Sequence, residues 1–270
     1  MIHAPLSTTS VLDESTEVVA MTGAPWFGLA VLTSLPLRYL QVIFLDQLIE
    51  LGGNAPRYGN LLGATANLIV LSMLAAIWGR AIYARAARLA WARGGAPGRG
   101  AWRVPPAALA SYVLTASAAA LLGYASLFTC IGFFVAVIMS GLAAGTMELN
   151  ESVSLTQPFR LIFRHTRSLR IPLALAFVFF CAIFVAAANL LGAFSIATWA
   201  AGAIGGFDAP HWQVLFGDNR RYLLVLFAGA VTAVEPFWIA AQVVFVRKAG
   251  AEESGDDLRA WFEELRRNEA

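Results

Sequence analysis

The sequence predicts an all-α, polytopic membrane protein with about six transmembrane helices. Composition is the first observation behind this class: hydrophobic residues make up 59% of the chain, charged residues make up 13%, and the mean hydropathy is +0.66. Soluble domains carry roughly twice that charged fraction. The second observation is that several apolar runs reach the ~20 residues that cross a bilayer as a helix. These runs are continuous rather than alternating, as expected of helices, which satisfy their backbone groups within the segment.

Six apolar runs are candidate spans. Pro105 and Pro172 open the third and fifth runs, at a position where a helix loses nothing through a missing N–H. The first run differs from the others because it carries two charged residues, Arg38 and Asp46, well inside it. The six predicted spans are residues 27–50, 60–80, 105–123, 126–146, 171–195 and 222–246.

Basic residues gather in alternate connections. Of the 19 Lys and Arg residues, 15 follow the second, fourth or sixth run, whereas Arg57, Arg220 and Arg221 lie on the opposite side. Cytoplasmic loops of membrane proteins carry the excess of Lys and Arg. Six spans with the N- and C-termini in the cytoplasm place all 15 on one side, and five spans break the pattern. The 15 are Arg80, Arg85, Arg88, Arg93, Arg99, Arg103, Arg160, Arg164, Arg167, Arg170, Arg247, Lys248, Arg259, Arg266 and Arg267.

The chain divides into three parts by composition. Residues 1–25 contain acidic side chains and no Lys or Arg, and they are expected to form an acidic N-terminal tail without a secretory signal peptide. Residues 26–248 form the predicted six-helix transmembrane domain. Residues 249–270 form a predicted C-terminal amphipathic cytoplasmic helix, because apolar side chains recur there at helical spacing. These are Leu258, Trp261, Phe262 and Leu265.

The fourth connection contains a second amphipathic segment, residues 155–170. Its apolar side chains, among them Phe159 and Phe163, share one side of a helix, and its arginines share another. A helix of this kind lies in the membrane interface with its arginines among anionic headgroups. The alternative, that these arginines only set the topology, stays open. The predicted headgroup-binding residues are Arg160, Arg164, Arg167 and Arg170.

Two charged residues fall near the middle of predicted spans: Arg38 in the run 27–50 and Glu235 in the run 222–246. A lone charge at the centre of a bilayer costs at least ~2.5–3.5 kcal/mol, so such residues usually face the bundle interior and pair. We therefore expect an Arg38–Glu235 pair. Asp46 is a poorer partner for Arg38, because it lies two turns along the same helix and is rotated away. The pair either fixes helix register or forms a proton or substrate site; sparse neighbouring polarity favours the first interpretation.

Residues with catalytic or metal-binding chemistry are scattered. The histidines, His3, His165 and His211, lie in three separate segments and form no metal-ligand spacing. Cys130 and Cys181 fall inside apolar runs, where we expect them to be small apolar core side chains. No HExxH, GxSxG or phosphate-loop pattern occurs. We therefore expect no catalytic, cofactor-binding or metal-binding residues, and no enzyme activity.

Two stretches resemble the bacterial family of glycerophosphodiester phosphodiesterase membrane-domain-like proteins. ELNESVSLTQPFRLIFRHTRSLR, at 148–170, is similar to the acidic-then-basic loop of that family, and EPFWIAAQVVFVRKAGAEESGDDLRAWFEELRR, at 235–267, is similar to its apolar span, basic pair and acidic segment. Two departures are an extra residue in EESGDDL and VFVRK in place of an aromatic-rich step. The resemblance implies a six-span membrane unit without the phosphodiesterase domain, and it carries over no catalytic residue.

These features predict a non-enzymatic integral membrane protein. All basic residues but Lys248 are arginine, as is typical of GC-rich bacterial genomes, so we expect the bacterial cytoplasmic (inner) membrane. The expected role is that of a scaffold or lipid-interacting subunit of an envelope assembly. The alternative is a small transporter that uses Arg38 and Glu235, and an intramembrane enzyme comes third. Expected partners are membrane lipids, anionic ones included; membrane-protein partners or a second copy stay open, and no nucleic acid is expected.

Overall fold

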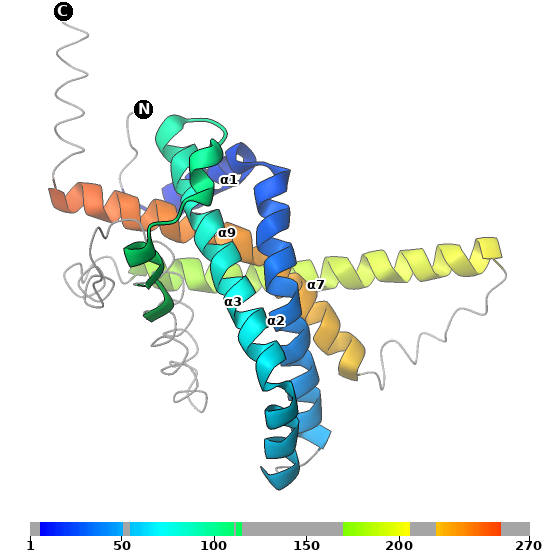
Figure 1. The fold of residues 1–270 in the computed structure, drawn as a ribbon. Coiled ribbons are helices and arrows are strands. Elements are labelled where there is room, and N and C mark those ends of the chain that lie inside the picture. The colour runs from blue at the N-terminus through cyan, green and yellow to red at the C-terminus, as the bar shows by residue number, and fades with distance from the viewer. Residues whose placement is uncertain (1–5, 51–54, 111, 115–169, 206–219, 255–270) are drawn as a thin grey trace, which may run out of the picture. The chain divides into compact units, whose positions relative to one another are not determined.

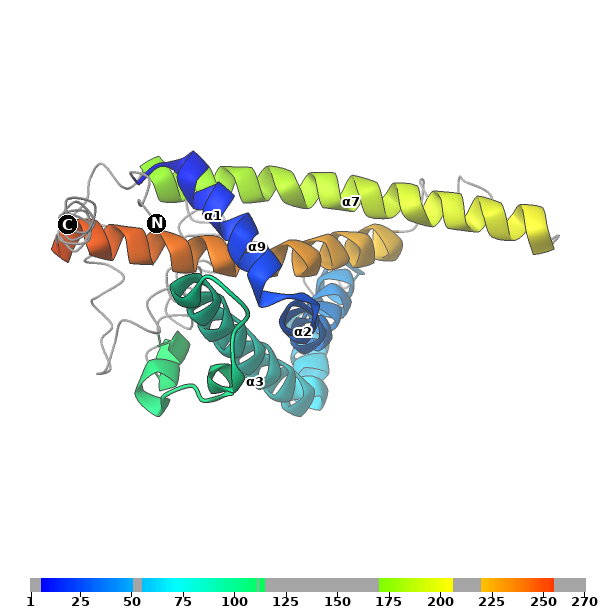
Figure 2. The ribbon, with the colours of Figure 1, turned by 90° about the horizontal axis from the view of Figure 1, so that it is seen from above.

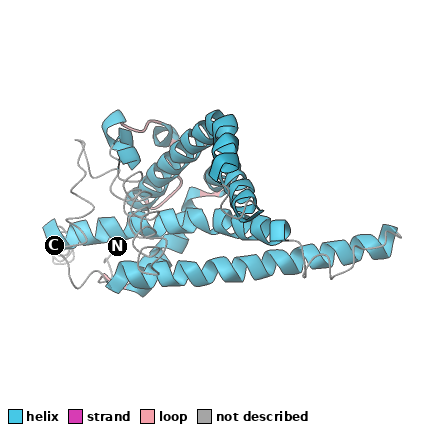
Figure 3. Cartoon of the chain, turned by 90° about the horizontal axis from the view of Figure 1, so that it is seen from below, coloured by secondary structure: helices cyan, strands magenta, loops and turns pink. Residues whose placement is uncertain are grey.

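The computed structural model describes residues 6–50, 55–110, 112–114, 170–205 and 220–254. Throughout these residues, the regular structure is helical and no strand occurs (Figure 3). The predicted all-helical class is therefore confirmed for this part of the chain. Its elements are α1 (Thr8–Thr22), α2 (Ala24–Glu50), α3 (Ala55–Arg93), the 3-10 helix η1 (Arg99–Trp102), α7 (Arg170–Gly205) and α9 (Arg220–Ser254), shown in Figure 1.

Among the described residues, 4 helices are long and apolar enough to cross a membrane. They overlap the first, second, fifth and sixth predicted spans. The third and fourth, 105–123 and 126–146, lie almost wholly outside the described residues, apart from helical turns at 106–110 and 112–114. The 4 segments are Ala24–Ile43, Ala66–Arg93, Arg170–Ile204 and Tyr222–Ala251.

The segment expected as an acidic tail contains a packed helix instead. Ser7 caps α1: its hydroxyl accepts from the backbone N–H of Ser10, and the Ser10 side chain accepts from the Ser7 N–H in return. Gly23 ends the helix with φ of 79°, a left-handed conformation that favours glycine. Side chains four, three and four residues apart share one face of α1 and are buried: Val11, Ser15, Val18 and Thr22.

The chain forms two compact units, and parts of α2, α3, α7 and α9 belong to each. Unit 1 comprises residues Met1–Gly28, Arg80–Val178 and Pro236–Ala270; unit 2 comprises Leu29–Gly79 and Phe179–Glu235. In unit 1, α1 lies against the C-terminal parts of α3 and α9 (Figures 1 and 2).

The core of unit 1 consists mainly of small side chains. Between residues 81 and 90 of α3, the alanines are fully buried together with Ile82 and Tyr83. Small side chains let helix backbones approach closely. An aromatic contact also lies in this unit: the rings of Trp26 and Trp102 are centred 5.0 Å apart. From α9, the core takes Ile239, Ala240, Ala241, Val243, Val244, Phe245, Val246 and Ala249.

Unit 2 directs many large apolar side chains outward. Leu32 and Tyr39 of α2 are 66% and 62% exposed, and Ile204 of α7 is 89% exposed. Such surfaces suit lipid rather than water. Cys181 also lies on the exposed side of α7, so it is not the core residue expected from its apolar run.

The helices of unit 2 nevertheless meet closely at one position. An added Cβ on Gly79 of α3 would lie 1.8 Å from the Oγ1 atom of Thr33 on α2. Glycine therefore lets these two helices touch through backbone and short side chains. Between α7 and α9, edge-to-face aromatic pairs make the contact, as between Phe184 and Phe227, whose centroids are 5.9 Å apart.

Candidate functional site

The structure brings Arg38 and Glu235 together inside unit 2. Arg38 Nη2 of α2 lies 3.4 Å from Glu235 Oε2 of α9, and the two side chains are 21% and 11% exposed. Arg38 Nη1 also donates to Gln41 Oε1, one turn along α2, at 2.9 Å. The guanidinium thus contacts the Glu235 carboxylate and the Gln41 amide through different nitrogens.

The direction of Arg38 follows from the periodicity of α2. Tyr39, the next residue of that helix, is 62% exposed, whereas the arginine is mostly covered. Asp46, which lies two turns further on, is 4% exposed. Arg38 and Asp46 are therefore kept from the outward surface, as expected for charges at membrane depth.

The contact between Arg38 and Glu235 is longer than the ~2.7–2.9 Å of a strong charge-assisted hydrogen bond, and it involves a single nitrogen and a single oxygen. It is suited to holding α2 and α9 in register rather than to locking the guanidinium rigidly.

Pro236 follows Glu235 inside α9 and removes one backbone N–H there. Helices in membranes tolerate such a proline because neighbouring groups satisfy the freed carbonyl.

The four predicted headgroup-binding arginines are only partly within reach of the structure. Arg160, Arg164 and Arg167 lie outside the described residues, as does most of the amphipathic segment 155–170. Arg170 is the first residue of α7 and is exposed. The C-terminal amphipathic helix also falls outside from residue 255 onward, and residues 249–254 continue α9.

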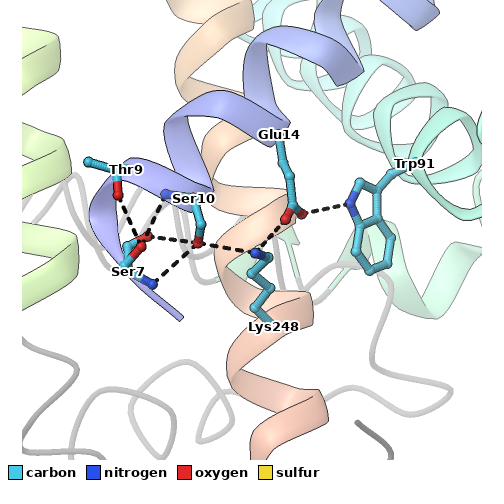
Figure 4. A network of polar contacts seen from close by, with 6 residues as sticks. All are labelled: Ser7, Thr9, Ser10, Glu14, Trp91 and Lys248. Carbon is cyan, nitrogen blue, oxygen red and sulfur yellow. Dashed lines mark hydrogen bonds and ion pairs between the residues drawn. The ribbon is translucent and has the colours of Figure 1, made fainter. Parts of the chain in front are cut away.

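A second polar site, which the sequence did not predict, lies in unit 1 (Figure 4). Lys248 Nζ of α9 forms an ion pair with Glu14 Oε1 of α1 and donates to Ser10 Oγ at 3.1 Å. The other oxygen of Glu14 accepts from Trp91 Nε1 of α3 at 3.2 Å. We call Ser10, Glu14, Trp91 and Lys248 the Glu14–Lys248 network.

The local fold explains how these groups meet. Ser10 and Glu14 are four residues apart, so they share one face of α1, and the capping box at Ser7 fixes where that helix begins. The side chain of Lys248 is only 5% exposed, and its contacts with Glu14 and Ser10 are both to α1. Burial of an ammonium group is costly unless it is paired, and α1 supplies the carboxylate and the hydroxyl that pair with the buried ammonium group of α9.

Arg247 contacts the same tryptophan, and two further arginines precede that tryptophan on α3. Arg247 Cζ lies 5.9 Å from the ring centroid of Trp91, in cation–π geometry. Arg85 and Arg88 precede Trp91 at three-residue steps on α3, and the Arg88 guanidinium interacts electrostatically with those of Arg247 and Arg85. We call Arg85, Arg88, Trp91 and Arg247 the arginine–tryptophan cluster.

The connection after α3 folds back beside this cluster. Arg85 Nε donates to the carbonyl oxygen of Gly100 at 3.0 Å, which ties η1 to α3. Trp102, at the end of η1, packs against Trp26 at the start of α2 and is 50% exposed. Tryptophans with basic side chains are typical of the membrane–water interface.

The chemistry of these sites is that of ion pairs, hydrogen bonds and a cation–π contact. Among the described residues, no group of three or more His, Cys, Asp or Glu side chains could hold a metal ion. Sequence reasoning assigned Arg85, Arg88, Arg247 and Lys248 to membrane topology alone. The contact of Arg247 with Trp91 depends on tertiary structure, which the spacing of residues along α3 does not reveal.

Comparison with known proteins gives no further identification: no family model matches the chain, and no curated protein and no solved structure matches it significantly.

Proposed function

We propose that this chain is a non-enzymatic integral membrane protein that acts as a scaffold or lipid-interacting subunit of an assembly in the bacterial cytoplasmic (inner) membrane. The observation that carries the proposal is the pair of tryptophan contacts in unit 1, Arg247 over Trp91 and Trp26 against Trp102. Side chains of this kind anchor a protein at the headgroup level and attract anionic lipids. The outward apolar side chains of unit 2 support immersion in lipid.

The proposed topology has six spans with both termini in the cytoplasm. It is supported by the Glu14–Lys248 network, because Glu14 precedes the first span and Lys248 lies at the end of the last one. Two points in contact lie on the same side of the membrane, which requires an even number of spans between them. Trp91 joins the same network from near the end of the candidate span Ala66–Arg93, and this agrees with the alternation of basic connections.

Membership of the glycerophosphodiester phosphodiesterase membrane-domain-like family is part of this proposal. It is supported by the likeness of residues 148–170 and 235–267 to that family, and by the six-span layout. The family would assign this chain a membrane role and no hydrolase chemistry of its own.

A small transporter is the second candidate, and one observation in unit 2 favours it. Ser34, Arg38 and Gln41 lie four and three residues apart on one face of α2, which places a line of polar groups along that helix. The Ser34 hydroxyl is buried and has no hydrogen-bond partner among the described residues. Substrate or proton pathways in membranes are lined by polar groups of this sort. The two candidates differ in what they require of the Arg38–Glu235 ion pair. A scaffold requires the two side chains to stay paired, and a transporter requires them to separate during its cycle.

The experiment that tests the main proposal is purification of the full chain from membranes, followed by mass spectrometry of retained lipids and proteins. Enrichment of anionic lipids over their share in the source membrane, or a stoichiometric membrane-protein partner, is the expected result. A preparation whose lipids mirror the source membrane and which carries no partner would contradict the proposal. Uptake or proton flux in proteoliposomes that disappears in Glu235→Gln would instead favour the transporter.

A further inference from the structure

One side of α7 carries an amide group among outward-facing side chains of unit 2. Asn189 is exposed, and its side chain makes no hydrogen bond within the described part of the chain. It lies well inside the candidate span Arg170–Ile204. Hydrocarbon offers no water to an amide, so the free energy of this group falls when another polar group meets it.

The aromatic contacts of α7 with α9 determine which way Asn189 faces. Phe184 packs edge to face against Phe227 of α9, with ring centroids 5.9 Å apart. Phe194 packs in the same way against Tyr222, at 6.1 Å. Both phenylalanines are five residues from Asn189, and five residues of an α-helix rotate a side chain by about 140°. Asn189 therefore lies on the side of α7 that is turned away from these contacts.

A further contact with α9 shows that Asn189 lies within the apolar layer. Leu190, the next residue, meets Gly229 of α9: a Cβ added to that glycine would lie 3.6 Å from Leu190 Cδ1. Gly229 is itself inside the candidate span Tyr222–Ala251. Both helices thus place the amide among apolar segments, where only another protein group can satisfy it.

The residues around Asn189 leave room for another helix. Gly192 and Ala193 follow it by three and four residues, and a Cβ added to Gly192 would meet nothing within 4 Å. Small residues let membrane helices approach until side-chain amides can bond across them. We give the name Asn189 face to five exposed residues that share this side of α7: Val185, Asn189, Gly192, Ala193 and Ile196.

A second exposed asparagine of unit 2, Asn67 of α3, lies in a different setting. Val70 and Leu71 follow it by three and four residues, and they are 55% and 63% exposed. Large side chains at these positions keep a neighbouring helix further from the amide. The Asn189 face is therefore better suited to a close contact between helices.

We propose that the Asn189 face is the contact between two copies of this chain, whose Asn189 side chains exchange hydrogen bonds across a two-fold axis. A carboxamide carries both donors and an acceptor, so it is complementary to a second carboxamide. Two copies inserted in the same orientation place Asn189 at the same depth, and a two-fold axis along the membrane normal brings the same residues face to face. This inference rests on the proposed scaffold function, for which it names the partner.

The test measures association of the full chain in vesicles of phosphatidylethanolamine and phosphatidylglycerol. In a Cys130→Ser/Cys181→Ser background, Ser254→Cys carries a donor or an acceptor dye, and Förster transfer is followed as added lipid dilutes the protein. We expect transfer in the wild type. Asn189→Leu should need on the order of tenfold more protein per lipid to reach the same transfer, because the interhelical hydrogen bonds are lost. Asn189→Gln keeps the carboxamide and should recover part of the association.

Two controls show whether the effect belongs to this face. Asn67→Leu makes the same change at an exposed asparagine outside the face, and it should leave association unchanged. Gly192→Leu keeps the amide but fills the space that a second helix needs, so it should weaken association. Gly63→Leu, at a glycine that also has nothing within 4 Å of an added Cβ, should not. Equal losses in Asn189→Leu and Asn67→Leu, or no loss in either, would overturn the proposal.

The remaining outcomes distinguish a second copy from other occupants of the face. If Asn189→Leu lowers the melting temperature of the monomer in detergent but leaves transfer unchanged, the amide is satisfied within its own chain and the proposal is overturned. A wild type that shows no transfer, yet retains anionic lipid or a different membrane protein on purification, overturns the second copy and leaves the proposed function standing. Release of the chain from membranes by alkaline carbonate overturns both.

Discussion

Unit 1 and unit 2 use the same four long helices for opposite kinds of packing. Between Ala66 and Trp78, in unit 2, α3 leaves most of its side chains exposed, among them Leu71 at 63%. Between Ala81 and Ala90, in unit 1, the same helix is buried on nearly every side. The residues change accordingly, from leucine, valine and methionine in the first stretch to alanine and arginine in the second.

This contrast shows that different parts of a single helix can be suited to two environments, lipid and the protein interior. Where lipid covers a helix, large apolar side chains face outward and burial within the protein is not needed. Where protein covers it, small side chains allow close approach, and polar groups need defined partners. Glu14, Lys248 and Trp91 supply such partners for one another in unit 1, and Arg38 contacts Glu235 and Gln41 in unit 2.

The largest expected effect is loss of the charge pair in unit 2. Arg38→Ala or Glu235→Ala should each destabilise the protein by about 3 kcal/mol, because each removes the opposite charge from a mostly buried group in a low dielectric. Partial exposure of the two side chains, 21% and 11%, keeps the effect from being larger. Thermal unfolding in detergent measures it. The double variant Arg38→Leu/Glu235→Leu should recover most of the loss. Additive losses with no recovery would show that the two charges do not support each other.

A second prediction concerns the close approach of α2 and α3. Gly79→Ala should lower stability by roughly 1–3 kcal/mol, because the new methyl group would overlap the side chain of Thr33 and force the helices apart. Gly63→Ala is the matched control on the same helix, since nothing lies within 4 Å of the added Cβ. That control should be neutral or stabilising by up to ~1 kcal/mol through helix propensity. Equal melting temperatures for the two variants would argue against the contact.

A third prediction tests whether unit 1 depends on α1. Lys248→Met or Glu14→Gln should cost on the order of 1–2 kcal/mol, since each leaves a partly buried polar partner unsatisfied. The effect on α1 should exceed the effect on overall stability, so the backbone amides of α1 should exchange hydrogen faster in both variants than in the wild type. Glu17→Gln removes the same charge from an exposed position of α1 and should leave exchange unchanged. Faster exchange in Glu17→Gln as well would point to helix propensity rather than to the network.

The last prediction involves no change in stability and identifies the side on which unit 1 lies. In a background with Cys130→Ser and Cys181→Ser, a cysteine at position 95 or 254 should react with an impermeant maleimide only from the cytoplasm. A cysteine at position 208 should react only from outside. This pattern is expected for six spans, since the basic residues follow the even-numbered runs. Labelling of positions 95 and 208 from the same side would rule the six-span topology out.

The sequence predicted unit 2 better than unit 1 for a physical reason. Long apolar runs indicate membrane-spanning helices directly, so four spans could be located from the sequence. Arg38 and Glu235 both fall near the middle of their runs, and this shared depth was enough to suggest that they meet. In unit 1 the relevant signals were weak. The acidic composition of residues 1–25 hid the buried spacing of Val11, Ser15 and Val18. The positive-inside rule already accounts for the basic residues near 85–93 and 247–248, so their positions in the sequence did not indicate that they also make tertiary contacts.

The contact between Ser10 and Lys248 joins residues separated by 238 positions in the chain. At ~5–20 residues per second, a ribosome needs on the order of tens of seconds to make the intervening segment. Throughout that interval α1 exists without the partner that Lys248 provides, and every intervening span is inserted before the two can meet. Closure of this contact is therefore a late assembly event. A chain truncated before Lys248 would keep its apolar helices in the membrane and leave the buried face of α1 open to proteases and chaperones.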